Sequence, residues 1–384
     1  MPKKAQTQNE VQQSKTLVYV SLIVISILTI VVCIPSVFEW FRLSSLDLII
    51  LIRRDFAHEK IDKLVDMTSA LGDKYGVFLC LCLAVALLDM NNYLSLIGVS
   101  TFGVAVNLLV KMMIRDERPY FYSTDYQPVS CNFEYGSPSG HGQTVTTFHL
   151  SFLTVFIRQY GIKNRKFLLY VAGYAFCIFM CFTRIWVGLH TAEQLLLGFG
   201  LGMIIHIIFL HVLDGYFDKL YQGIETGKTR LFNRFIILHC IMAVAAIFMY
   251  DYIGKYDPAP EEWINSVKRA CPHEKKFISF EYSCLFKYLV AFGSMGAYFG
   301  CYFRRWVLKS KDGSKFKKPS SFFKALIRIV INIIAFALLS LPAALASRKS
   351  PVPLQLLVKG FIVPFLTTAV SMLYINPVIR MLNI

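Results

Sequence analysis

Long apolar stretches, separated by short polar connectors, dominate the pattern along this chain. A helix needs about 20 apolar residues to cross a bilayer, and ten stretches reach or approach that length. They lie at 17–38, 76–90, 93–113, 142–157, 167–183, 191–213, 233–252, 282–303, 325–346 and 354–375. The first follows basic residues but lacks a small-residue cleavage site, so it predicts an uncleaved anchor. The pattern predicts an all-α, polytopic membrane helix bundle of about ten transmembrane helices in the lipid bilayer.

The composition agrees with this pattern. Hydrophobic residues make up 55% of the 384 residues and charged residues only 17%, and a soluble core cannot bury that much apolar surface. The net charge of +16 would suit a protein that binds nucleic acid. The basic residues, however, occupy short connectors rather than a recognition element, so we expect no nucleic-acid partner.

Lys and Arg are concentrated in alternate connectors, which predicts the orientation of a membrane protein. The basic connectors are the N-terminus, 158–166, 214–234 and 304–319. They and both chain termini are expected on the cytosolic side. The connectors on the far side are then 39–75, 114–141, 184–190 and 253–281. In 39–75, apolar and charged residues mix too finely to span, which predicts amphipathic helix on the membrane surface or packed under the bundle.

Three polar clusters interrupt the apolar pattern, and all three belong to the far side. Their sequences are "KMMIRDERP", "GSPSGHGQT" and "TRIWVGLHTAEQ". The side chains of interest are Lys111, Arg118, Ser139, Gly140, His141, Arg184 and His190. Arginine binds phosphate oxygens with two parallel hydrogen bonds, lysine adds a point charge, and a glycine at a helix start exposes backbone N–H groups. Together these groups favour a phosphate site.

The two histidines add reactivity to that site. Hydrolysis of a phosphate ester without a metal needs one nucleophile and one acid for the departing oxygen. The far side carries no cluster of acidic residues that would hold two metal ions. We therefore expect a site that uses no metal and no other cofactor.

The motifs K-x6-RP, PSGH and (S/T)R-x5-H, in this order, resemble the type-2 phosphatidic acid phosphatase superfamily, which includes the vanadium haloperoxidases. Its third motif usually ends with an aspartate four residues beyond the histidine, where this chain has Gln194. That glutamine, with "RPYFYSTDY" and "CNFEYGSPSGH", resembles the glucose-6-phosphatase branch. The likeness extends over roughly residues 45–380 and is strongest over 98–200. The segment 17–38 lies outside it.

The resemblance implies a type-2 phosphatidic acid phosphatase-like core and a phosphoric monoester hydrolase acting on glucose 6-phosphate. His190 would be the nucleophile, forming a phosphohistidine, and His141 the general acid and base. The residues expected to bind phosphate are Lys111, Arg118, Ser139, Gly140 and Arg184. A glutamine cannot supply an aspartate's charge. The group that orients His190 is therefore open among Gln194, Asp73 and a backbone carbonyl.

The resemblance also implies an endoplasmic reticulum membrane protein with a luminal site and a sugar-phosphate transporter as a partner. Three parts are expected: residues 1–40 as a tail and extra anchor, 41–215 as the phosphatase core, and 216–384 as C-terminal transmembrane helices. Two alternatives stay open. One is a lipid phosphate or polyprenyl pyrophosphate phosphatase, and the other is a non-catalytic sensor or transporter of sugar phosphates.

Two cysteines, Cys131 and Cys271, lie in polar connectors of the far side, whereas most others lie in apolar runs. In an oxidising compartment they could form a disulfide that closes the connector 253–281 over the site loop. Two unrelated free thiols are the simpler alternative, because a shared side does not establish a short separation.

Overall fold

All regular structure is helical in the part of the chain that the structure describes. The computed structural model describes residues 23–381 apart from 24, 28, 33, 73, 273–276, 294, 307–320 and 346–349. Within these residues every element is a helix, which confirms the all-α prediction. Six helices are long and apolar enough to cross a membrane, or seven if one bent pair counts as a span. The six are Met90–Tyr122, Lys166–Trp186, Ala192–Thr226, Arg230–Tyr256, Phe280–Trp306 and Val352–Leu373.

The prediction of about ten spans is therefore wrong for the described residues, and three of the differences have physical causes. The run at 76–90 forms α4 (Lys74–Leu87), whose 14 residues are too few to cross a bilayer. The segment expected at 17–38 is broken, because Pro35 starts a new helix bent by 78° from Ile25–Val32. The run at 142–157 is rich in Thr and other polar residues, and its helix is not among the six. The run at 325–346 forms α16 (Phe322–Leu345), which is not among them either.

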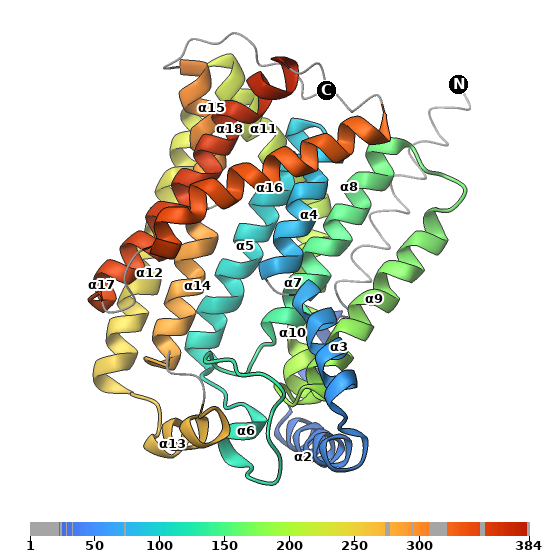
Figure 1. Cartoon of the computed structure of the whole chain (residues 1–384), viewed down its shortest axis with the longest axis vertical. Helices are drawn as coiled ribbons and strands as arrows, with labels where there is room; N and C mark the ends of the chain where they lie inside the picture. The colour runs from blue at the N-terminus through green and yellow to red at the C-terminus, as the bar shows by residue number, and fades with distance from the viewer. Residues whose placement is uncertain are drawn as a thin grey trace.

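Helix α5 (Met90–Ile114) runs through the middle of the bundle and carries Lys111 near its end. The Asp89 side chain caps its start by accepting a hydrogen bond from the Asn92 N–H. The helix stops where Arg115 adopts a left-handed conformation with φ of 55°. Helices α4, α11 (Asp214–Thr226) and α14 (Phe280–Gly293) pack around it (Figure 1). This central position leaves the Lys111 side chain fully buried.

A second helical run presents the PSGH motif. It consists of α7 (Gly140–Thr144), the π-helical turn η3 (Val145–His149) and α8 (Leu150–Tyr160). Ser139 caps its start, since its Oγ accepts a hydrogen bond from the Gly142 N–H at 3.3 Å. Helix α10 (Ala192–Ile208) packs tightly against this start: a Cβ on Gly198 would lie 2.4 Å from the Ser139 carbonyl oxygen. Glycine is therefore required at 198 for the two motif-bearing helices to meet.

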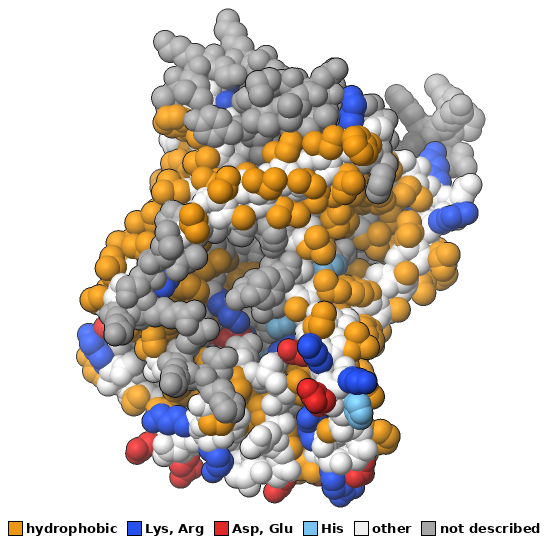
Figure 2. All heavy atoms as spheres, viewed as in Figure 1, with side chains coloured by type: hydrophobic (Ala, Val, Ile, Leu, Met, Phe, Trp, Pro, Cys, Tyr) orange, Lys and Arg blue, Asp and Glu red, His pale blue; other side chains and the backbone are white. Residues whose placement is uncertain are grey.

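One end of the bundle, the lower end in Figure 1, carries helices α2 (Pro35–Leu51), α6 (Pro119–Tyr122) and α13 (Glu261–Ala270). The prediction of helix within 39–75 is confirmed by α2 and by α3 (Glu59–Ser69). Figure 2 shows charged side chains of both signs at this end and a broad apolar surface above it. The loops that carry the three polar clusters converge toward this end. Most of the basic connector 304–319 lies outside the described residues.

A disulfide joins Cys131, in the loop after α6, to Cys271 at the end of α13. Their Cα atoms are 6.2 Å apart, although 140 residues separate them in the sequence. The alternative of two free thiols is therefore wrong, and the connector after α12 (Arg230–Tyr256) is tied to the loop that leads into the PSGH motif.

The bridge can be tested on purified protein. Alkylation without reduction, followed by proteolysis and mass spectrometry, should give one linked pair of peptides that contain Cys131 and Cys271. Reduction before alkylation should replace that pair with two separately alkylated peptides. Cys80 and Cys82, which are free thiols in α4, serve as internal controls. Alkylation of both Cys131 and Cys271 without reduction would rule the bridge out.

Candidate active site

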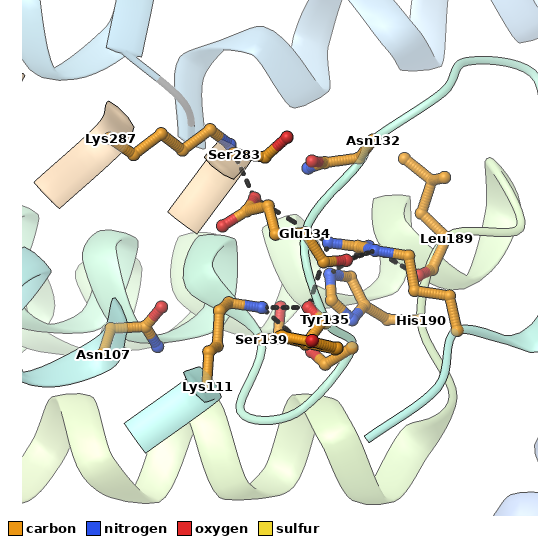
Figure 3. A network of polar contacts seen from close by, with 12 residues as sticks. Asn107, Lys111, Asn132, Glu134, Tyr135, Ser139, Leu189, His190, Ser283 and Lys287 are labelled. Carbon is orange, nitrogen blue, oxygen red and sulfur yellow. Dashed lines mark hydrogen bonds and ion pairs between the residues drawn. The ribbon is translucent and has the colours of Figure 1, made fainter. Parts of the chain in front are cut away.

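Lys111 reaches from the last turn of α5 into the loop that precedes α7. Its Nζ donates hydrogen bonds to the backbone oxygens of Tyr135 at 2.5 Å and Gly136 at 3.1 Å. Figure 3 shows the side chain pointing at this loop, near Ser139. An ammonium group buried among carbonyl oxygens is a cation held in place before any anion binds.

Arg118 lies on the other side of the same loop and is fully buried. Its Nε donates to the Glu134 carbonyl at 2.7 Å, and its Nη1 donates to the Leu189 carbonyl at 2.9 Å. The same Nη1 lies 3.0 Å from Nε2 of His190. Arg118 thus connects the loop before the PSGH motif to the loop that carries His190, and it joins the first motif to the third.

His190 is 1% exposed, and both of its ring nitrogens have partners. Nε2 faces the Arg118 guanidinium, and Nδ1 lies 3.0 Å from Oε1 of Gln194. Because a guanidinium can only donate, Nε2 must accept and Nδ1 must carry the proton. This tautomer leaves Nε2 unprotonated, with its lone pair accepting the hydrogen bond from Arg118. A histidine reacts as a nucleophile only through an unprotonated ring nitrogen.

The remaining predicted residues lie around these groups. Gly140 starts α7, and a Cβ built on it would lie 3.4 Å from Asn107 Oδ1 and 3.9 Å from Lys111 Cε. His141 is 8% exposed and lies beside Gly72. The side chain of Arg184 is buried, and its Nη1 donates to Ser69 Oγ at 2.5 Å. Asp73, the other residue considered for orienting His190, lies outside the described residues.

Glu134 is a buried carboxylate beside this cluster. Its Oε1 accepts a hydrogen bond from Lys287 Nζ at 2.6 Å and lies 3.8 Å from Arg118. Burial raises the pKa of Glu134, but Lys287, Lys111 and Arg118 outweigh that effect and hold the pKa well below its usual range. Glu134 is therefore ionised. With Lys111, Arg118, Arg184 and Lys287 against the carboxylates of Glu134 and Asp116, the cluster keeps an excess of positive charge.

The electrostatic surroundings also fix the charge of His190. Burial lowers its pKa well below the usual histidine range, and the charges of Arg118, Lys111 and Arg184 lower it further. The hydrogen bond to Gln194 acts in the opposite direction but is outweighed. The imidazole is consequently neutral at neutral pH, and Nε2 keeps the lone pair that accepts the hydrogen bond from Arg118.

Four residues of this cluster were not singled out from the sequence: Asn107, Asp116, Glu134 and Lys287. Asp116 and Glu134 occur inside the quoted stretches "KMMIRDERP" and "CNFEYGSPSGH". Lys287 interrupts an apolar run, and an ionisable residue in such a run is a recognised sign of function. This sign could have identified Lys287 from the sequence. No feature of the sequence indicates that Lys287 pairs with Glu134, which lies 153 residues earlier.

The bundle and its site define a multi-pass integral membrane protein with a buried, cationic histidine site suited to phosphate. Residues 92–218 match the family model described as "PAP2 superfamily". The matched residues make up about a third of the chain and include all three motifs. The match is narrower than the span of 45–380 estimated from the sequence.

Curated relatives are similar to part of the chain. It is 27% identical over 150 residues to "Glucose-6-phosphatase catalytic subunit 1" of Rattus norvegicus, which covers 34% of this chain and 42% of that protein. The same protein of Canis lupus familiaris is 27% identical over 144 residues, which make up 32% of this chain and 40% of that protein. The chain thus matches about two fifths of the length of these relatives.

Among solved structures, the chain is similar to a "transmembrane PAP2 type phosphatidylglycerolphosphate phosphatase from Bacillus subtilis". The TM-score is 0.41 at 17% identity, and the match covers 52% of this chain and 96% of that one.

Proposed function

We propose that this protein hydrolyses glucose 6-phosphate to glucose and phosphate through a phosphohistidine intermediate. The observation that carries the proposal is the state of His190. Its Nδ1 is held by Gln194, and its Nε2 faces Arg118 inside a cluster with excess positive charge. A residue that only binds phosphate has no need of a neutral imidazole fixed in one tautomer.

In the first step the Nε2 lone pair of His190 attacks phosphorus in line with the sugar oxygen. An N–P bond forms and the P–O bond to the sugar breaks, while His141 donates its proton to the departing oxygen. Lys111, Arg118 and Arg184, with Ser139 and the Gly140 N–H, stabilise the three equatorial oxygens. The phosphoryl group approaches Nε2 from the side on which Arg118 now donates, so the guanidinium would transfer its hydrogen bond to a phosphate oxygen.

In the second step water attacks phosphorus and the N–P bond breaks. His141, deprotonated in the first step, takes a proton from the attacking water and is ready for the next cycle. Inorganic phosphate leaves, and His190 regains its lone pair. One ester and one water thus give one alcohol and one phosphate.

The polar rim of the site supports a sugar over a lipid as the leaving group. Figure 3 shows Lys287, Ser283, Asn132 and Glu134 close to the phosphate-binding residues. Lys287 and Glu134 are paired with each other, and the hydroxyl groups of a sugar can add hydrogen bonds to such a charged pair, whereas an acyl chain cannot. Gln194 in place of the superfamily's aspartate, and the partial similarity to glucose-6-phosphatase catalytic subunits, support the same choice.

We also propose that the site faces the lumen of the endoplasmic reticulum, with both chain termini in the cytosol and a sugar-phosphate transporter as the supplier of substrate. The disulfide between Cys131 and Cys271 supports this orientation, because such bonds persist in oxidising compartments. In Figure 1 the ends of α8, α11 and α15 (Gly296–Trp306), next to the basic connectors, lie at the opposite end of the bundle.

A comparison of substrates tests the reaction and its specificity. The purified protein should release phosphate from glucose 6-phosphate at least about ten times faster, in kcat/KM, than from phosphatidic acid or a polyprenyl pyrophosphate in the same detergent. The reverse order would identify a lipid phosphatase. Binding of glucose 6-phosphate without any release of phosphate would identify a sensor or transporter.

A further inference from the structure

The hydrogen bonds behind His190 continue past Gln194 to a residue with no assigned role. The Gln194 amide donates from Nε2 to Oδ2 of Asp116 at 2.7 Å and to the Glu117 carbonyl oxygen at 2.6 Å. Its Oε1 lies 3.0 Å from Nδ1 of His190. Gln194 is 1% exposed, so these three contacts use its hydrogen-bonding groups in a site without competing solvent.

These contacts determine which way the Gln194 amide points. If the amide were turned over, its oxygen would face the Asp116 carboxylate and the Glu117 carbonyl, two acceptors that have no proton to offer. The observed orientation satisfies both amide hydrogens and leaves Oε1 for the Nδ1–H of His190. Gly136 makes room for it, since a Cβ there would lie 2.3 Å from Gln194 Nε2.

We propose that Asp116 is a positioning residue. Acting through the Gln194 side chain, it supplies the negative charge that the aspartate of the superfamily's usual third motif would supply directly. His190, Gln194 and Asp116 then form a relay in which the amide transmits polarisation from the carboxylate to the imidazole. The relay rests on the proposed function, because it gives His190 the role of nucleophile.

The chemistry of the intermediate explains why such a charge is useful. When Nε2 of His190 bonds to phosphorus while Nδ1 keeps its proton, the ring becomes positively charged. A carboxylate that polarises the Gln194 amide makes Oε1 a stronger acceptor for that Nδ1–H, because linked hydrogen bonds reinforce one another. Asp116 thereby favours the phosphorylated ring over the free one without touching the substrate.

Other charged groups surround both ends of the relay. The pKa of His190, already lowered by burial, is lowered further by the positive charges of Arg118, Lys111 and Arg184. Arg42, on α2, lies 3.9 Å from Asp116 and also forms an ion pair with Glu117, and Glu193 of α10 is a further carboxylate nearby. Arg42 lies near Oδ1 of Asp116, whereas Gln194 donates to Oδ2. The carboxylate is therefore fixed between a cation and an amide.

The test uses the full-length protein and two substrates, glucose 6-phosphate and p-nitrophenyl phosphate. Asp116→Asn should lower kcat about 10- to 100-fold, as loss of a supporting hydrogen-bond partner commonly does, with little change in KM. Since a negative charge that stabilises the imidazolium is lost, the pKa of His190 falls. The acidic limb of the kcat/KM profile, where His190 must be neutral, should therefore move to lower pH.

A double variant separates the relay from a merely structural role. Gln194→Asp alone places a second carboxylate beside Asp116 and should lower kcat through repulsion. Combined with Asp116→Asn, it restores one carboxylate next to His190, so the double variant should be faster than either single variant. Asp125→Asn, a change at an exposed carboxylate hydrogen-bonded to Ser123, is the matched control and should leave kcat unchanged.

Several results would overturn the relay. One is an Asp116→Asn protein with the wild-type kcat and pH profile. Another is a double variant slower than both single variants, which would mean that Asp116 only holds the loop together. If the wild-type protein hydrolyses p-nitrophenyl phosphate but not glucose 6-phosphate, the sugar assignment fails while the relay is still tested. If it hydrolyses neither, the phosphatase proposal fails and the relay fails with it.

Discussion

Replacing His190 with alanine should lower kcat by about 10⁴-fold or more, because removal of a nucleophile closes the covalent route entirely. The same variant should lose the acid-labile phosphoenzyme that the wild type forms with ³²P-labelled glucose 6-phosphate. Rapid quenching into alkali, followed by gel electrophoresis, measures the labelled protein, and released phosphate measures turnover. Both signals should vanish together.

His239→Ala is the matched control for this experiment. His239 lies in α12 and is hydrogen-bonded through Nδ1 to the Phe235 carbonyl of its own helix at 2.8 Å. Its loss should leave both labelling and turnover near the wild-type values. If His190→Ala kept substantial turnover, or kept the label, another residue would be the nucleophile and the role of Arg118 beside Nε2 would need a different explanation.

Replacing His141 with alanine should have an effect that depends on the leaving group. General acid catalysis contributes about 10²- to 10⁴-fold when the departing oxygen is a poor leaving group. Formation of the phosphoenzyme from glucose 6-phosphate should slow by that factor. With p-nitrophenyl phosphate, whose phenolate departs without a proton, it should slow much less. Single-turnover labelling with each substrate gives the two rates separately.

The His141→Ala variant should still bind phosphate, since His141 is assigned to proton transfer rather than to holding the phosphate oxygens. In the wild type, competitive inhibition by inorganic phosphate measures that binding. In His141→Ala, whose turnover is slow, displacement of bound labelled phosphate by unlabelled phosphate measures it instead. Equal losses of rate with both substrates would contradict the acid role and would point to a structural role for His141 at the start of α7.

The sequence predicted which polar residues lie together better than it predicted the number of spans. Lys111, Arg118 and His190 are identifiable because their motifs are short and the residues have few other reasons to occur together between apolar runs. The structure places Arg118 against His190, as the motifs imply. The number of spans was overestimated, because hydropathy responds to composition and does not register a bend at Pro35 or the short length of α4.

Contacts between distant segments could not be predicted in the same way. Asp116 is one of two adjacent acidic residues, and nothing in the local sequence distinguishes the one that meets Gln194 from its neighbour. The pairing of Glu134 with Lys287 depends on how α14 packs against α5. Such contacts follow from the packing of whole helices, which the apolar pattern alone leaves undetermined.

The anchoring of the site loop has a consequence for biosynthesis. Three residues of the loop are held by partners far downstream: Cys131 by Cys271, Tyr135 by Glu281, and Glu134 by Lys287. A ribosome that has released the chain only as far as the last motif has made every proposed catalytic residue but none of these partners. The nascent protein therefore acquires its reactive groups early and its finished active site only after α14 has entered the bundle.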